Sequence, residues 1–135
     1  MPLITWSDRL SVSVAEIDGQ HRQLIAIIND LTEAIKKGKA QAAIGETVQG
    51  LIDYATQHFE TEEKYFKQFD YPEAASHIEE HEEFMQKVAG FKTRPAMGQF
   101  SLSIQVLQFL GDWLITHIMG TDRKYSDFFN RHGLK

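Results

Sequence analysis

Residues 44–69 read IGETVQGLIDYATQHFETEEKYFKQF, and the spacing of the side chains in this stretch decides the fold. Steps of three and four residues alternate along one stripe, which holds Ile44, Val48, Leu51, Ala55, His58, Glu62, Tyr65 and Phe69. This alternation is typical of a helix that buries one face in a helical bundle. Because the stretch contains no proline, it predicts one long helix over about residues 40–69.

Three other segments show the same spacing and predict three more helices. The first should begin at Asp18, whose side chain can cap a helix, and should end before Gly38. The four helices are expected at about residues 18–37, 40–69, 73–92 and 101–130.

These helices and their short connections predict a single domain over residues 1–135, with residues 1–17 as an N-terminal arm. Amphipathic helices joined by short loops pack best against one another. The expected architecture is therefore all-α: an up-down-up-down four-helix bundle.

Composition excludes several classes of function. The formal net charge of −5 argues against a nucleic-acid partner, which needs a basic face. The absence of cysteine excludes disulfides, iron–sulfur clusters and thiol nucleophiles. No apolar run is long enough for membrane insertion and no secretory signal is visible, so a cytoplasmic location is expected.

The predicted stripes carry polar groups where apolar side chains belong. Burying an unpaired charge is very costly, and buried polar groups are normally hydrogen-bonded or bound to metal. A metal centre would satisfy carboxylates and imidazoles together. The seven candidate ligands are His21, His58, Glu62, His77, His81, His117 and Asp122.

The spacing of these residues supports a shared site. His58 and Glu62 lie four residues apart, as do His77 and His81, and such pairs share one helix face. Glu63 is expected to turn away from His58, which favours Glu62 as the ligand. His117 and Asp122 are five residues apart, so they face together only if a π-bulge absorbs one residue.

Two smaller expectations concern the surroundings of these residues. Gly120 lies inside the five-residue step and would tolerate an unusual backbone there. The run of acidic residues in the third helix is expected to be solvated surface; it comprises Glu79, Glu80, Glu82 and Glu83.

Nitrogen and oxygen ligands without sulfur suit iron, zinc, manganese or copper, and the residues alone do not choose among them. Seven ligands are too many for one ion. Two octahedral ions offer about twelve positions, and five imidazoles, two bridging carboxylates and a bridging oxide or hydroxide would leave one position open.

The candidate ligands and their spacing resemble those of a known family. His58-x-x-x-Glu62, His77-x-x-x-His81 and His117-x-x-x-x-Asp122, preceded by His21 in the IDGQH motif, resemble the hemerythrin signature in the same order. The resemblance covers nearly the whole chain. The Tyr71-Pro72 turn and the WLITHI stretch at 113–118 are similar to single-domain bacteriohemerythrin.

The resemblance implies two iron ions with a bridging oxide or hydroxide. His77, His81 and His117 would hold one iron, His21 and His58 the other, and Glu62 and Asp122 would bridge them. Dioxygen would bind reversibly at the iron with the open position. The protein would then be a carrier, store or delivery protein and not an enzyme, with an oxygen-consuming enzyme as a possible recipient.

An apolar dioxygen pocket is expected beside the irons, with Leu114 as a gate. Its candidate residues are Phe59, Trp113, Leu114, Ile115 and either Ile25 or Ile17. Excluding water there should slow the loss of reduced oxygen species. The competing interpretations are an oxygen or nitric oxide sensor, a di-iron peroxidase or oxidase, and a structural bundle without metal.

Overall fold

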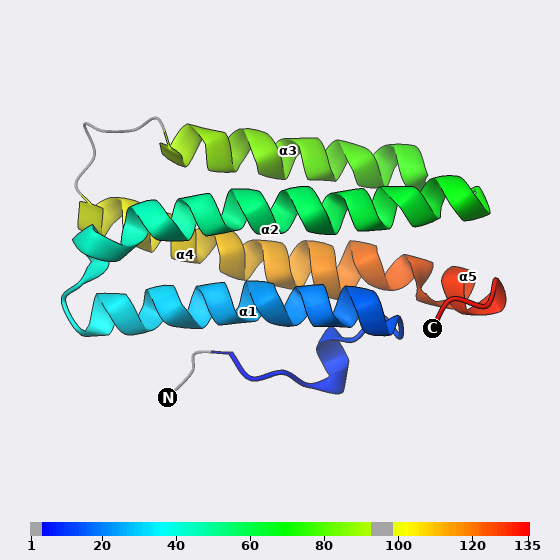
Figure 1. Cartoon of the computed structure of the whole chain (residues 1–135), viewed down its shortest axis with the longest axis horizontal. Coiled ribbons are helices and arrows are strands. Elements are labelled where there is room, and N and C mark those ends of the chain that lie inside the picture. Colours follow the sequence, from blue (N-terminus) through cyan, green and yellow to red (C-terminus); the bar gives the residue numbers. More distant parts are fainter. Residues whose placement is uncertain (1–3, 93–98) are drawn as a thin grey trace.

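The computed structural model describes residues 4–92 and 99–135, and this part of the chain contains helices and no strand. Four long helical rods lie side by side, and successive rods run in opposite directions (Figure 1). The prediction of an all-α four-helix bundle is confirmed. The long helices are α1 (Ala15–Lys36), α2 (Ala40–Phe69), α3 (Ala74–Lys92) and α4 (Gln99–Trp113).

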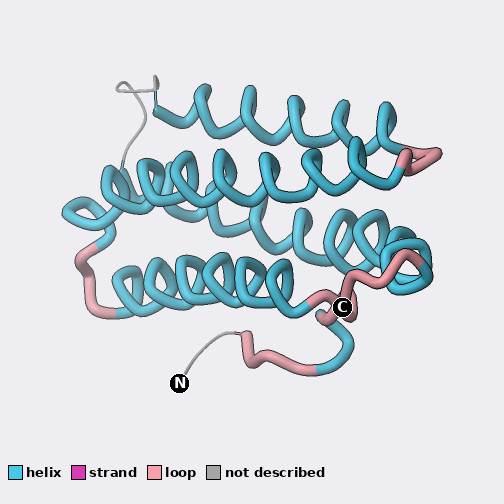
Figure 2. Tube along the Cα trace, turned by 45° about the vertical axis from the view of Figure 1, so that its right-hand side comes forward, coloured by secondary structure: helices cyan, strands magenta, loops and turns pink. Residues whose placement is uncertain are grey.

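The fourth rod changes its helical type along its length. After α4 it continues as a π-helix, η2 (Leu114–Thr121), then as a 3₁₀ turn, η3 (Asp122–Tyr125), and ends in α5 (Ser126–Arg131). The N-terminal arm contains one short 3₁₀ turn, η1 (Asp8–Leu10), and runs along α1 (Figure 2).

The first helix begins three residues earlier than expected, and Asp18 is not its N-cap. The capping position is Val14, whose backbone is extended. Asp18 lies inside α1, where its carboxylate accepts hydrogen bonds from Ser11 Oγ at 2.6 Å and from the Val12 backbone N–H at 2.8 Å. The aspartate therefore ties the arm to the helix, a role that requires the arm to fold back.

Two tight turns end the first two long helices. Gly38 follows α1 with a φ of +71°, a left-handed conformation that glycine adopts without strain. Asp70 follows α2 with a φ of +52°, and the Tyr71 N–H then donates to the Phe66 carbonyl. These turns reverse the chain and bring α2 into antiparallel contact with both α1 and α3.

Two apolar clusters fill the bundle, and the polar residues that interrupt the apolar stripes lie between them. The larger cluster includes Leu24, Ala55 and Phe84, and the smaller includes Ile17 and Phe66. Along α1 and α2 the histidines fall between members of the two clusters. The polar layer thus crosses the bundle with hydrocarbon on both sides.

None of the helices in the described ranges combines the length and the apolar character that crossing a bilayer requires.

Candidate metal centre

The fold brings all seven predicted ligands together from four helical rods. Each is fully buried, with no more than 2% of its surface exposed. The contributions are His21 from α1, His58 and Glu62 from α2, His77 and His81 from α3, His117 from η2 and Asp122 from η3.

One group of ligand atoms belongs to Glu62, His77, His81, His117 and Asp122, and all of these atoms lie within 4.8 Å of one another. Asp122 Oδ1 is 2.8 Å from His77 Nε2 and 2.9 Å from His117 Nε2. Glu62 Oε1 is 2.9 Å from His81 Nε2. Ligands bound at about 2.1 Å and at right angles around one ion lie about 3 Å apart, so this spacing suits a metal ion.

A second group consists of His21, His58, Glu62 and Asp122. His21 Nε2 lies 3.2 Å from His58 Nε2 and 3.1 Å from Asp122 Oδ2. His58 Nε2 lies 3.4 Å from Glu62 Oε1. Both carboxylates belong to both groups, and Asp122 presents Oδ1 to one group and Oδ2 to the other.

Several polar atoms in this layer have no hydrogen-bond partner in the described part of the chain. Those that face the other ligands are His77 Nε2, His81 Nε2, His117 Nε2, Glu62 Oε1 and both oxygens of Asp122, and the outer atoms are His21 Nδ1 and His77 Nδ1. Buried polar atoms without partners are strongly destabilising. Cations between the ligands would satisfy the inward-facing atoms together, so the residues present fit bound metal.

The charges of the layer support the same conclusion. Burial lowers the pKa of His58 to about 4, which keeps its lone pair free to bind a metal. Burial also tends to lower the pKa of His77, but the carboxylates of Asp122 and Glu62 outweigh it and raise that pKa to about 10. The layer therefore attracts positive charge, either a proton or a metal ion.

The π-helix explains how His117 and Asp122 face the same site. The Asp122 N–H donates to the His117 carbonyl five residues earlier, the bonding pattern of a π-helix. The expected bulge is thus an eight-residue π-segment. Gly120 is not its cause, because the backbone there has no positive φ and an added Cβ would meet only the Ile115 carbonyl oxygen, at 4.0 Å.

Three residues that the sequence did not assign to the site hold ligand histidines from behind. Gln20 Oε1 lies 2.7 Å from His58 Nδ1. Glu63 Oε2 lies 3.0 Å from His81 Nδ1, and Glu80 Oε1 lies 3.0 Å from His117 Nδ1. Glu63 does turn away from His58 but reaches the neighbouring helix. The expectation that Glu80 is only solvated surface is wrong.

Tyr125 adds a further contact from the smaller apolar cluster. Its hydroxyl donates to Glu62 Oε2, while Glu62 Oε1 faces the histidines. Burial and the charges of Asp122 and Glu62 raise the pKa of Tyr125 well above its ordinary value. The tyrosine therefore keeps its proton and fixes the orientation of the Glu62 carboxylate.

Aromatic rings stack on His81, His117 and His58. Phe59 stacks on His81 with ring centres 3.8 Å apart, and Trp113 stacks on His117 at 3.9 Å. Tyr54 stacks on His58 at 5.2 Å. Like the buried Ile25 and Leu114, these three aromatic residues belong to the larger apolar cluster.

Two residues proposed for the apolar pocket lie elsewhere. Ile115 is 65% exposed, because it follows Trp113 by two residues and so faces the opposite side of the rod. Its assignment to an interior pocket is wrong. Ile17 is buried in the smaller cluster, whereas Ile25 is in the larger one with Phe59, Trp113 and Leu114.

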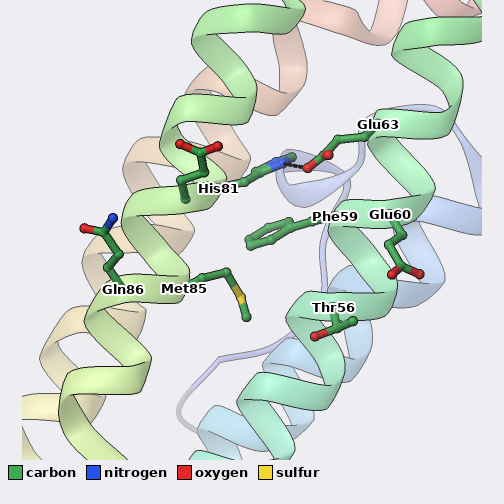
Figure 3. Close-up of a pocket in the computed structure, with 8 residues that line it drawn as sticks. Thr56, Phe59, Glu60, Glu63, His81, Met85 and Gln86 are labelled. Carbon is green, nitrogen blue, oxygen red and sulfur yellow. Dashed lines mark hydrogen bonds and ion pairs between the residues drawn. The ribbon is translucent and has the colours of Figure 1, made fainter.

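An open pocket on the outer face of α2 and α3 reaches the back of the site (Figure 3). His81 and Phe59 lie at its inner end, and Glu63 meets His81 there. The residues that line it are Thr56, Phe59, Glu60, Glu63, His81, Glu82, Met85 and Gln86.

Comparison with known proteins agrees with this geometry. Residues 12–129 match the family model described as the hemerythrin HHE cation binding domain. A bacteriohemerythrin of Stenotrophomonas maltophilia is 35% identical over 132 residues, which cover 98% of this chain and 85% of that protein. One from Pseudomonas aeruginosa is 32% identical over 94% of this chain and 82% of that protein.

Solved structures show the same similarity. A crystal structure of wild-type hemerythrin has a TM-score of 0.79 and 27% identity, and the match covers 93% of this chain and 96% of that one. A leucine-to-alanine variant of hemerythrin has a TM-score of 0.81 and 26% identity over 94% of this chain and 97% of that one.

Proposed function

Because this chain belongs to the hemerythrin HHE cation-binding family, we propose that it binds dioxygen reversibly at a pair of non-haem irons. Its role would be that of a carrier, store or delivery protein, with an oxygen-consuming enzyme as recipient. The observation that carries the proposal is the pair of overlapping ligand groups that share Glu62 and Asp122.

Two ions account for the ligand set better than one. His77, His81 and His117 would hold one iron, and His21 and His58 the other. Asp122 would bridge them, since its two oxygens face different histidines at 2.8 and 3.1 Å. Glu62 would be the second bridge, and an oxide or hydroxide the third. The two-histidine iron would keep one open position. A bound iron pair would supply the reversible electron transfer that dioxygen binding requires.

The chain's own residues favour reversible binding over oxygen activation. In the described part of the chain two carboxylates belong to the ligand groups, whereas ferritin-like di-iron centres use four glutamates with two histidines. Because this site has fewer anionic oxygens than a ferritin-like centre, it would stabilise highly oxidised iron less. The larger apolar cluster, which contains Phe59, Trp113, Leu114 and Ile25, would keep water from the bound gas and slow its loss in reduced form.

A reversible spectrum tests this function. The iron-loaded protein is reduced without oxygen, exposed to air, and then freed of the gas over several cycles. We expect a visible charge-transfer band that appears and disappears, with about two irons per chain. His58→Ala should abolish the band. His132→Ala is the matched control, because His132 is exposed and its Nδ1 bonds to the Phe128 carbonyl.

Other outcomes would favour the competing functions. Irreversible bleaching in the first cycle would contradict a carrier and indicate a sensor or an enzyme. Turnover of hydrogen peroxide well above that of free iron would indicate a peroxidase.

A further inference from the structure

The histidines of the two ligand groups differ in the hydrogen-bond partners of their Nδ1 atoms, which face away from the site. Each imidazole that binds a metal through Nε2 can donate a hydrogen bond from Nδ1 to a second residue. Such outer partners fix the ring and raise its basicity, and a carboxylate does so more strongly than a neutral acceptor. The chemical type of each partner is therefore informative.

The three-histidine group has two carboxylate partners. His81 Nδ1 lies 3.0 Å from Glu63 Oε2, and Figure 3 shows the two side chains facing each other across the inner end of the open pocket. His117 Nδ1 lies 3.0 Å from Glu80 Oε1. Thr121 Oγ1 donates to the same Glu80 carboxylate at 3.1 Å and steadies it.

Both carboxylates are partly exposed to water. The Glu63 and Glu80 side chains are 39% and 36% exposed, while the histidines they contact are buried. A partly hydrated carboxylate does not carry the large desolvation cost of a fully buried ion. The contacts thus set anionic acceptors directly behind two buried ligands.

Among residues 4–92 and 99–135, no carboxylate holds the outer nitrogen of either histidine in the two-histidine group. His58 Nδ1 faces the amide oxygen of Gln20 at 2.7 Å, and the Gln20 amide donates to Thr61 Oγ1 at 3.0 Å, which fixes its orientation. His21 Nδ1 is buried without a hydrogen-bond partner in the described residues. The outer environment of this group is neutral.

We propose that Glu63 and Glu80 are positioning residues that lower the reduction potential of the three-histidine iron relative to the two-histidine iron. Greater basicity of His81 and His117 stabilises ferric over ferrous iron at that position. The two ions are then electronically unequal before any ligand binds. The inference rests on the proposed iron pair but does not require dioxygen binding.

The test uses the full chain loaded with ⁵⁷Fe and kept free of oxygen. Glu63→Gln and Glu80→Gln remove the charge but keep the size and an acceptor oxygen. Gln20→Glu adds a carboxylate behind His58. Glu60→Gln is the matched control, because Glu60 lines the same pocket but points away from His81 in Figure 3. Redox titration gives the potential, and Mössbauer spectroscopy shows which iron has changed.

Glu63→Gln and Glu80→Gln should each weaken ferric relative to ferrous binding by about tenfold, a rise of about 59 mV for a one-electron couple. Both should alter the same Mössbauer signal. Gln20→Glu should lower the potential and alter the other signal, and Glu60→Gln should change neither.

The proposal is overturned if Glu63→Gln shifts the potential no more than Glu60→Gln, or if Gln20→Glu and Glu63→Gln alter the same iron. Loss of iron from both glutamine variants would also overturn it, provided that the thermal midpoint of the metal-free protein is unchanged. The contacts would then serve only to retain iron. None of these readouts depends on oxygenation, so failure of the carrier function remains a separate result.

Discussion

Asp122 is the residue that contacts both ligand groups through different oxygens. Its Oδ1 lies 2.8 Å from His77 Nε2, and its Oδ2 lies 3.1 Å from His21 Nε2. The positions of Asp122 and the other six polar residues were predictable, because each interrupts an apolar stripe. The use of both oxygens was not predictable, since it depends on how η3 faces α1 and α3.

The outer partners were missed for a similar reason. Gln20 precedes the ligand His21, Glu63 follows Glu62, and Glu80 precedes His81. Each nevertheless bonds a histidine on a different rod: His58, His81 and His117 respectively. Spacing along a single helix cannot show such contacts. A polar residue directly beside a ligand was the only available signal.

Leu114 and Ile115 offer a direct comparison of a buried and an exposed neighbour. Leu114→Ala should speed autoxidation of the oxygenated protein by admitting water, and should destabilise the protein by about 2–5 kcal/mol. Ile115→Ala should leave the autoxidation rate unchanged and alter stability by less than about 0.5 kcal/mol. Decay of the visible band and urea unfolding give the two readouts. Equal autoxidation rates in the two variants would remove Leu114 as a gate.

At the scale of the element, the fourth rod departs most from a regular helix. The five-residue step from His117 to Asp122 predicted an irregularity at the right place. Its extension over eight residues and the following 3₁₀ turn were not predictable, because they depend on packing of both faces at once. The early start of α1 likewise depends on Asp18 contacting the arm.

The backbone conformation requires glycine at position 38 but not at position 120. Gly38→Ala should cost about 1–2 kcal/mol, because an alanine would be held at a φ of +71°. Gly120→Ala should be neutral or stabilise by about 0.5–1 kcal/mol and keep the iron content, since space for a Cβ exists there. Urea unfolding and metal analysis measure both effects. Loss of iron from the Gly120 variant would show that the π-segment needs glycine.

At the scale of the whole molecule, a polar layer divides the bundle into two apolar clusters. At about 1.5 Å per residue counted from the turns, the helix lengths place the seven residues at a similar height. The cost of the layer to the metal-free protein is the desolvation of charged and polar groups. Stability should therefore depend on pH and on metal.

In the metal-free protein, two histidines should make stability greatest near pH 6.5. The pKa of His58 falls to about 4 on folding, so stability is lost as pH drops from 6.5 towards 4. The pKa of His77 rises to about 10, so stability is present below pH 6.5 and is lost as pH rises through 10. Bound metal replaces the His77 proton and should abolish the alkaline loss.

Urea unfolding between pH 4 and pH 10, with and without metal, measures this difference. Stability of the metal-free protein that rises steadily from pH 7 to pH 10 would be inconsistent with the charges assigned to the layer.

Anomalous X-ray diffraction from crystals of the iron-loaded protein, recorded at the iron absorption edge, tests the central claim most directly. We predict two iron peaks in the polar layer, one bonded to His77, His81 and His117 and the other to His21 and His58, with Glu62 and Asp122 joining them. A single peak, or peaks bound away from these seven side chains, would contradict it.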